Sequence, residues 1–98
     1  MITYEVSITI DSDRESEWLH WMQTEHIPDV MATGYFEENA ITRVVGESTY
    51  VIRYKCKDMA TYEEYRDMHA PALQDKHNVL FDGDFTAVRR ILESLDSD

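Results

Sequence analysis

The sequence predicts an α+β fold in which two helices cover one face of a four-stranded antiparallel sheet. Three observations point to it. Residues 2–10 alternate between apolar and polar side chains, which is typical of a strand with one buried face. Two helical segments with aromatic faces each run into a His-x-Pro step, at residues 26–28 and 69–71. The three glycines fall at junctions between the expected elements, at Gly34, Gly46 and Gly83.

The first half of the chain reads as a strand followed by a helix. After strand 2–10, the polar run Asp11-Ser12-Asp13 offers N-cap side chains for a helix from about Asp13 to Glu25. Pro28 has no amide proton and restricts the residue before it, so the helix must kink or stop there, or restart with Pro28 in its first turn. Gly34 then ends the segment as a C-terminal cap.

The middle of the chain predicts a β-hairpin. Residues 35–45 form an irregular second strand, and Gly46-Glu47-Ser48 fits a tight connection. The run 49–56 is rich in β-branched and aromatic side chains, so it is the third strand, with Cys56 at its end.

The last part of the chain repeats the helix pattern and adds a strand. Asp58 can cap a second helix, Pro71 interrupts it, and a restart reaches about residue 79 or 80. Asp82-Gly83-Asp84 is a turn signal before the fourth strand, 85–92. We expect one domain over 1–95 and a frayed acidic tail at 96–98.

The resulting order, β-α-β-β-α-β, is the ferredoxin-like arrangement, for which the strand order 4-1-3-2 is expected. Both helices then lie on one face of the sheet, and the other face has no cover of its own. An exposed sheet face is costly, so we expect a second copy of the chain, or a ligand, to cover it. A homodimer is also plausible because a 98-residue chain buries a modest share of its surface alone.

Composition excludes several classes of function. Nine basic and twenty acidic residues give a net charge of −11, which repels phosphate backbones and anionic headgroups, so we expect neither nucleic acid nor a membrane as partner. The start of the sequence has no signal-peptide pattern, and the single cysteine fits a reducing compartment, so a cytoplasmic location is expected. The sequence has no nucleotide-binding glycine loop and no two-histidine metal spacing, and no cofactor or metal is predicted.

The segments 17–34 and 62–73 resemble a bacterial family of short proteins, the domain of unknown function 4286. The motifs on which this resemblance rests are Glu25-His26-Ile27-Pro28-Asp29 and His69-Ala70-Pro71-Ala72-Leu73. More distantly, the layout is similar to dimeric α/β-barrel proteins. That resemblance implies a homodimer and admits monooxygenase, isomerase, dehydratase and haem-degrading members as well as non-catalytic ones. The haem-degrading members need a tryptophan on a strand, whereas both tryptophans here fall in the first predicted helix.

His26 and His69 are the candidate catalytic residues. Each ends a helical segment, where the dipole favours the imidazolium, and a histidine that titrates near neutral pH can serve as general acid or base. The alternative is structural. The proline two positions on deprives a carbonyl of its amide partner, and an imidazole N–H can satisfy that carbonyl.

Arginines and aromatic residues supply the candidate ligand-binding groups. Glu5 on the central strand is expected to pair with Arg53 and with Arg89 or Arg90, either to hold a carboxylate or enolate or to fix the register of a dimer. The aromatic face that includes Trp18 and Tyr65 can line a pocket, or it can simply form the core.

Two functional hypotheses follow. The first is a homodimeric binding or interaction module without enzymatic activity. The second is a cofactor-independent enzyme of the monooxygenase, isomerase or dehydratase type, acting on a small aromatic or carboxylated molecule. An enclosed cavity of about 300 Å³ or more, lined by His and Arg, favours the enzyme. A filled interior, with both histidines bonded to backbone carbonyls, favours the binding module.

Overall fold

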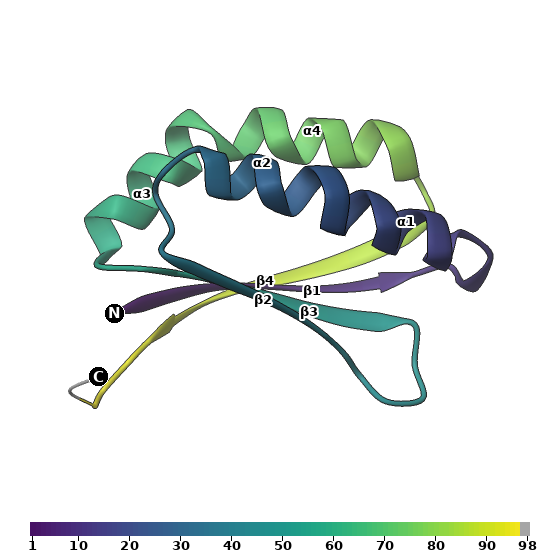
Figure 1. Cartoon of the computed structure of the whole chain (residues 1–98), viewed down its shortest axis with the longest axis horizontal. Helices are drawn as coiled ribbons and strands as arrows, with labels where there is room; N and C mark the ends of the chain where they lie inside the picture. Colours follow the sequence, from purple (N-terminus) through teal and green to yellow (C-terminus); the bar gives the residue numbers. More distant parts are fainter. Residues whose placement is uncertain (97–98) are drawn as a thin grey trace.

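A computed structural model describes residues 1–96 and shows a twisted antiparallel sheet with helices on one side only (Figure 1). The strand order is β2-β3-β1-β4, which confirms the predicted order 4-1-3-2 and the ferredoxin-like fold class. The strands are β1 (Ile2–Ile10), β2 (Glu38–Arg43), β3 (Thr49–Cys56) and β4 (Phe85–Glu93). Residues 97–98 of the predicted acidic tail lie outside the described part of the chain.

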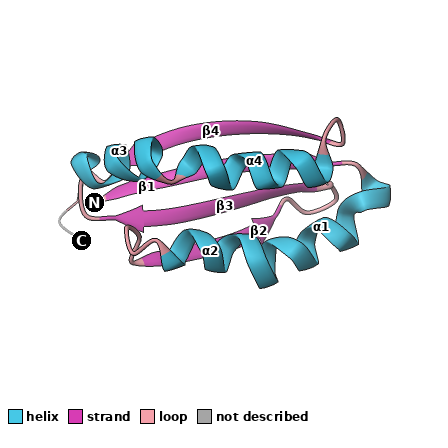
Figure 2. Cartoon of the chain, turned by 90° about the horizontal axis from the view of Figure 1, so that it is seen from above, coloured by secondary structure: helices cyan, strands magenta, loops and turns pink. Residues whose placement is uncertain are grey.

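The helices form two arms that lie side by side over the sheet (Figure 2). The first arm follows β1 and the second follows β3, and no helix among residues 1–96 is long and apolar enough to cross a membrane. The first arm consists of a short 3-10 turn (Ser12–Arg14), α1 (Glu15–Trp21), a π-helical turn (Met22–His26) and α2 (Ile27–Ala32). The second arm consists of α3 (Met59–Met68) and α4 (Ala70–Phe81).

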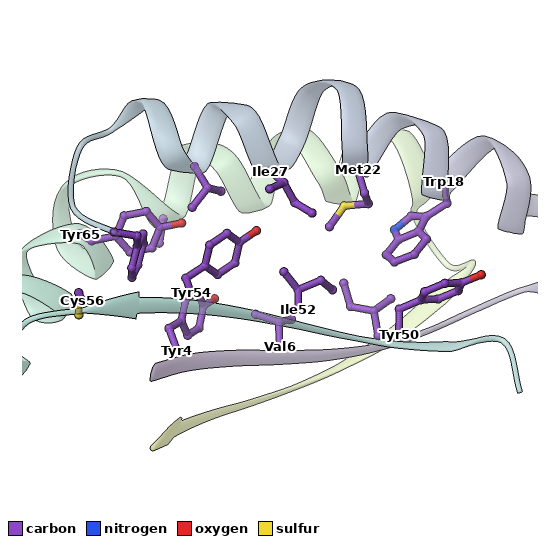
Figure 3. Close-up of a cluster of buried hydrophobic side chains, with 14 of the residues drawn as sticks. Tyr4, Val6, Trp18, Met22, Ile27, Tyr50, Ile52, Tyr54, Cys56 and Tyr65 are labelled. Atoms are coloured by element: carbon purple, nitrogen blue, oxygen red, sulfur yellow. The ribbon is translucent and has the colours of Figure 1, made fainter. Parts of the chain in front are cut away.

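The alternation of β1 separates its two faces. Ile2, Tyr4, Val6, Ile8 and Ile10 point toward the helices and are all buried. Together with alternate residues of β3 and the inner faces of both arms, they form the core between sheet and helices, as Figure 3 shows. At about 25 cal/mol per Å² of buried apolar surface, this packing is the main stabilising contribution to the fold.

The first arm does not end before Pro28. A π-helical turn precedes the proline, and the helix continues with Pro28 in the first turn of α2. Its buried side chains, Trp18, Met22, Ile27 and Val30, follow one another at steps of four, five and three residues. The five-residue step exceeds one α-helical turn, so the chain needs one extra residue there to keep Ile27 on the core side. The amide of Ile27 accordingly donates to the carbonyl of Met22, five residues back. The interruption therefore begins before the predicted helix end at residue 25.

The second arm breaks where the sequence predicted it. His69 has φ −125° and ψ −37°, so it leaves the helical conformation between α3 and α4, and Pro71 lies in the first turn of α4. The N-cap at Asp58 is also confirmed, because its Oδ1 accepts the backbone N–H of Thr61 at 2.9 Å. The side-chain N-cap expected at residues 11–13 is wrong. The Asp11 side chain makes no capping hydrogen bond, and the backbone N–H of Arg14 donates to the backbone carbonyl of Asp11 instead.

Two of the boundaries that differ from the sequence prediction are explained by residues buried in the core. β2 covers only Glu38–Arg43, because Phe36 turns into the core and the residues around it connect α2 to the sheet. α4 reaches Phe81, a residue or two beyond the predicted end, because the Phe81 side chain is fully buried under the arm. Neither difference changes the topology.

Candidate functional site

A small cavity lies between the sheet and the two helical arms. Its floor comes from β1, β3 and β4, and its walls come from the π-helical turn, α2, α3 and α4. The volume of the cavity is about 30 Å³, which leaves room for about two water molecules. The lining residues are Tyr4, Val6, Ile8, Met22, His26, Val30, Ile52, Tyr54, Tyr65, Leu73, Gln74, His77 and Arg89.

The π-helical turn brings His26 to the cavity wall. Its ring stacks on Trp21, with centroids 5.1 Å apart and planes 30° apart, and it meets His77 edge-on at 5.9 Å. Burial lowers the pKa of His26 to about 4, and the positive potential of His77 adds to the effect. The imidazole is therefore neutral at pH 7. Among residues 1–96, no side-chain hydrogen bond joins His26 to a backbone carbonyl, so the predicted structural role at the helix break is not seen.

His77 faces His26 from α4 and is almost completely buried. Its Nε2 accepts a hydrogen bond from the indole Nε1–H of Trp18 at 2.9 Å. Burial lowers the pKa of His77, the side chain of Asn78 acts in the opposite direction, and the charge of Arg89 lowers it again. The sequence patterns did not single out His77 as a site residue. Its position seven residues after Ala70, on the buried side of α4, is the signal that places it toward the sheet.

Among the described residues that line the cavity, Arg89 is the cationic side chain. It lies on the helix-side face of β4, opposite Val6 of β1, and its Nε donates to the hydroxyl of Tyr4 at 3.2 Å. Tyr4 stacks in turn with Tyr54 at 5.9 Å and lies 6.1 Å from the ring of Tyr65. Burial raises the pKa of both Tyr54 and Tyr65, so these two phenols stay protonated at neutral pH.

The other predicted catalytic histidine lies elsewhere. His69 sits at the junction of α3 and α4, packs against Tyr35 at 5.3 Å and stacks with Tyr65 at 6.4 Å. It is not part of the cavity wall. Trp18 also lies outside the wall and reaches it through its hydrogen bond to His77. Of the predicted site residues, the structure brings together His26, Tyr65 and Arg89.

Glu5 and Arg53 lie on the opposite, uncovered face of the sheet. Glu5 Oε1 is 2.8 Å from Arg53 Nη2, and its Oε2 is 2.6 Å from Arg90 Nη2, so Arg90 and not Arg89 is the second partner. Only 5% of the Glu5 side chain is exposed. Burial raises the pKa of Glu5, but the hydrogen bonds and charges of Arg90 and Arg53 outweigh it, and the net pKa is lowered. The cross-strand ion pairs that the sequence predicted are confirmed.

The chemistry of the cavity is that of neutral imidazoles, phenols and one guanidinium. Within residues 1–96, no three His, Cys, Asp or Glu side chains are close enough to hold a metal ion. Cys56 is buried and its pKa is raised by that burial, so it is a structural thiol. The groups present include a cation that attracts an anionic group and a neutral imidazole that can accept a proton.

Solved structures with the same fold include proteins with enzymatic names. SnoaB, a cofactor-independent oxygenase from Streptomyces nogalater, superposes with a TM-score of 0.75 at 12% identity, covering 98% of this chain and 94% of that one. A dimeric ferredoxin-like protein from an uncultured marine organism gives 0.75 at 10% identity, covering 100% and 98%. A protein of the ethyl tert-butyl ether d (ethd) family from Bacillus halodurans gives 0.74 at 13% identity, covering 97% and 100%. At these identities the likeness shows the fold.

No curated protein matches the chain in sequence. A family model does match, over residues 1–95, and this range includes both His-x-Pro segments and the whole sheet. The chain belongs to the family described as Domain of unknown function (DUF4286).

Proposed function

We propose that this protein is a homodimeric binding protein for a small, weakly acidic aromatic molecule, which it holds in the cavity between the sheet and the helical arms. The observation that carries this proposal is the convergence of His26, His77 and Arg89 on one cavity from three different elements. Polar groups that converge on an otherwise apolar, aromatic cavity are typical of small-molecule sites.

The charges in the wall favour an anionic or acidic ligand. Arg89 attracts a carboxylate or a phenolate, and no acidic side chain is among the lining residues to oppose it. The neutral His26 can accept a proton from a ligand hydroxyl, and a negative charge beside it raises its pKa toward the physiological range. The rings of Tyr4, Tyr54 and Tyr65 suit an aromatic body.

The cavity must widen to admit such a ligand. Its 30 Å³ is well below the roughly 300 Å³ of ordinary ligand pockets, so the size expected for the enzyme hypothesis is absent. The walls most able to move are the two arms, where α2 and α4 face each other across the cavity. On the outer surface they are bridged by the exposed ion pair between Lys76 Nζ and Asp29 Oδ2 at 3.4 Å. Exposed pairs of this kind are weak, so this ion pair adds little to the free energy needed to part the arms.

The uncovered face of the sheet supports the dimer part of the proposal. It carries the Glu5–Arg53–Arg90 ion pairs, with Val51 and Val88 beside them in a shallow depression. Val88 is 64% exposed on this face. A second copy laid on it would remove these side chains from water, and the ion pairs would then fix the register of the two sheets. The similarity to a dimeric ferredoxin-like protein points the same way.

The test is a thermal-shift screen with hydroxybenzoates, other aromatic carboxylates and phenols. A ligand that binds the native state raises its stability by RT ln(1 + [L]/Kd), so a hit raises Tm in a concentration-dependent way. Arg89→Gln and His26→Gln should each weaken a hit by at least about tenfold. Arg66→Gln is the matched control, because Arg66 is an exposed arginine of α3 that pairs with Asp67 outside the cavity. A hit that survives both cavity substitutions would place binding elsewhere and contradict the proposal.

A second function is favoured by the state of His26. Its imidazole is neutral and is free to accept a proton, as a cofactor-independent enzyme requires, and SnoaB shares the fold under the name of a cofactor-independent oxygenase. If the protein is an enzyme of this kind, it will catalyse exchange of the acidic C–H of a bound enolisable acid with D₂O. NMR measures this exchange directly. His26→Gln should remove the exchange, and wild-type protein that binds a ligand without exchanging it would be a binding protein.

A further inference from the structure

We infer that Trp18 is a positioning residue that fixes His77 in its neutral Nδ1–H tautomer and so leaves proton exchange with the ligand to His26. The part that concerns the ligand rests on the proposed function. The tautomer itself is a property of the free protein and is tested without any ligand.

The geometry of the Trp18–His77 pair sets the tautomer. Trp18 is fully buried, and an indole nitrogen can only donate a hydrogen bond. Its Nε1 lies 2.9 Å from His77 Nε2, so that ring nitrogen must be the acceptor and carry no proton. In a neutral imidazole the proton is then on Nδ1. The sequence separation of 59 residues means that only the packed arms bring the two side chains together.

Protonation of His77 would break this pair. With a proton on Nε2, two N–H donors would face each other at hydrogen-bonding distance, and the indole would lose its acceptor inside the core. His77 is itself only 5% exposed, so the charged ring would also lack water. Both costs oppose the imidazolium form of His77.

The surroundings of His77 act in the same direction. From the first arm it meets the ring of Trp21 at 5.8 Å and the ring of His26 at 5.9 Å. From β4 it meets the ring of Phe85 at 4.4 Å and the charge of Arg89, and its own helix presents Asn78. Of these groups, Arg89 and a protonated His26 would repel an imidazolium, and Asn78 favours one.

The consequence falls on His26. A positive charge on His77 lowers the pKa of His26, so a neutral His77 removes a repulsion that would keep His26 from taking up a proton. Of the facing pair, His77 uses one ring nitrogen for Trp18, whereas no hydrogen bond joins the side chain of His26 to another residue in the range 1–96. His77 is therefore held in one tautomer in the cavity wall, and His26 is the residue that can exchange protons with a ligand.

The first experiment is a long-range ¹H–¹⁵N NMR measurement of the histidine tautomers in the wild-type protein at pH 7. We expect a pyridine-type Nε2 and a protonated Nδ1 for His77, together with an indole N–H of Trp18 that exchanges slowly with solvent. An Nε2–H tautomer, or an imidazolium at pH 7, would overturn the inference.

Two substitutions of the same kind separate a positioning role from general packing. Trp18→Phe removes the N–H donor, and the titration midpoint of His77 should then rise by about one pH unit or more. Trp21→Phe is the control, because Trp21 lies one turn along α1 and contacts the same ring without an indole hydrogen bond to it. It should leave the tautomer of His77 unchanged. Equal effects of both substitutions would mean that packing alone sets the tautomer, and the inference would fail.

The wild-type measurement decides the tautomer even if Trp18→Phe does not fold. It also separates the two proposals. The expected tautomer in a protein that binds no aromatic acid would reject the proposed function alone. Ligand binding with the Nε2–H tautomer would reject the role of Trp18 alone.

Discussion

The two facing histidines show how local environment divides identical side chains. His26 and His77 both lose water on folding, and the pKa of each is lowered as a result. Within residues 1–96, His77 has a hydrogen-bond partner in the core, the indole of Trp18, and His26 has none. The same side chain is therefore held by a hydrogen bond on α4 and by ring contacts in the π-helical turn. This difference comes from neighbours distant in sequence.

The lowered pKa of His26 makes stability depend on pH. Its folded pKa of about 4 lies below the usual 6.5, so the unfolded chain binds the proton more readily, and stability falls as pH drops from 6.5 to 4. With allowance for its half-buried position, we expect about 2 kcal/mol of this loss to come from His26. Urea unfolding of wild type and His26→Gln at pH 7 and pH 4.5 measures it. Identical losses in the two proteins would show that His26 is not perturbed.

Glu5 is the second residue whose environment can be tested directly. Its lowered pKa means that its ion pairs with Arg53 and Arg90 stabilise the fold above pH 4.5 and are lost as the carboxylate is protonated at lower pH. Glu5→Gln should destabilise by about 1 to 3 kcal/mol at pH 7, since both arginines lose a buried partner.

The matched control is Glu38→Gln. Glu38 is an exposed strand residue that pairs with Lys55 at 3.6 Å, and its replacement should change stability by less than about 0.5 kcal/mol. Urea unfolding at one fixed protein concentration compares the two variants. An equally small effect of Glu5→Gln would show that the buried geometry adds nothing.

Among the elements, the first helical arm positions His26 through its π-helical turn. Its π-helical turn exists because Met22 and Ile27 are both core residues five positions apart, and it places His26 on the cavity wall. Pro28 fits this turn because its missing amide proton falls where the α-helical ladder is already broken.

Deletion of Thr24, an exposed residue of the π-helical turn, tests this account. The deletion brings Met22 and Ile27 to four-residue spacing, so the arm should become a regular α-helix with its buried face preserved. We expect stability within about 1 kcal/mol of wild type, because the core contacts are kept. The affinity for the proposed ligand should fall, because the π-helical turn that directs the His26 side chain toward the cavity is removed.

The control is deletion of Glu63, an exposed residue of the regular helix α3. Without an extra residue to remove, it turns Tyr65 by about 100° out of the core and should destabilise the fold by several kcal/mol. Circular dichroism and thermal unfolding measure both variants. A collapse of the Thr24 deletion to the level of the Glu63 deletion would contradict the role of the five-residue step.

At the scale of the whole molecule, the one-sided placement of the helices is the decisive feature. It leaves a sheet face with a buried carboxylate, exposed Val88 and half-buried Val51, and the cavity lies on the other side of the same sheet. The proposed dimer and the proposed ligand site therefore use opposite faces, and substitutions can separate them.

Sedimentation equilibrium at micromolar concentration tests the dimer. We expect a mass close to twice the 11.5 kDa of one chain. Val88→Arg should give a monomer, because it adds a charge to the uncovered face where the second copy would pack. Val79→Arg, on the outer surface of α4, should leave the dimer intact, although Val79 is 80% exposed and thus even more accessible. Monomeric wild type, or equal effects of both substitutions, would rule out this interface.

Sequence by itself determined the architecture. The alternation of residues 2–10, the β-branched run 49–56, the cap at Asp58 and the break at His69 all predict local structure correctly, because each depends on neighbours a few positions away. The pairing of Glu5 with arginines on both sides follows in turn from the strand order.

Only the tertiary structure decided which groups share the cavity. His26, His77 and Arg89 come from three elements. A shift of one residue in the pairing of β4 with β1 would put Arg90 in place of Arg89 on the helix side, and the sequence left this register open. The separation of His69 from the cavity, despite its repeated His-x-Pro motif, has the same cause. A motif fixes the path of the backbone nearby, whereas the direction of a side chain relative to distant elements is set by how those elements pack.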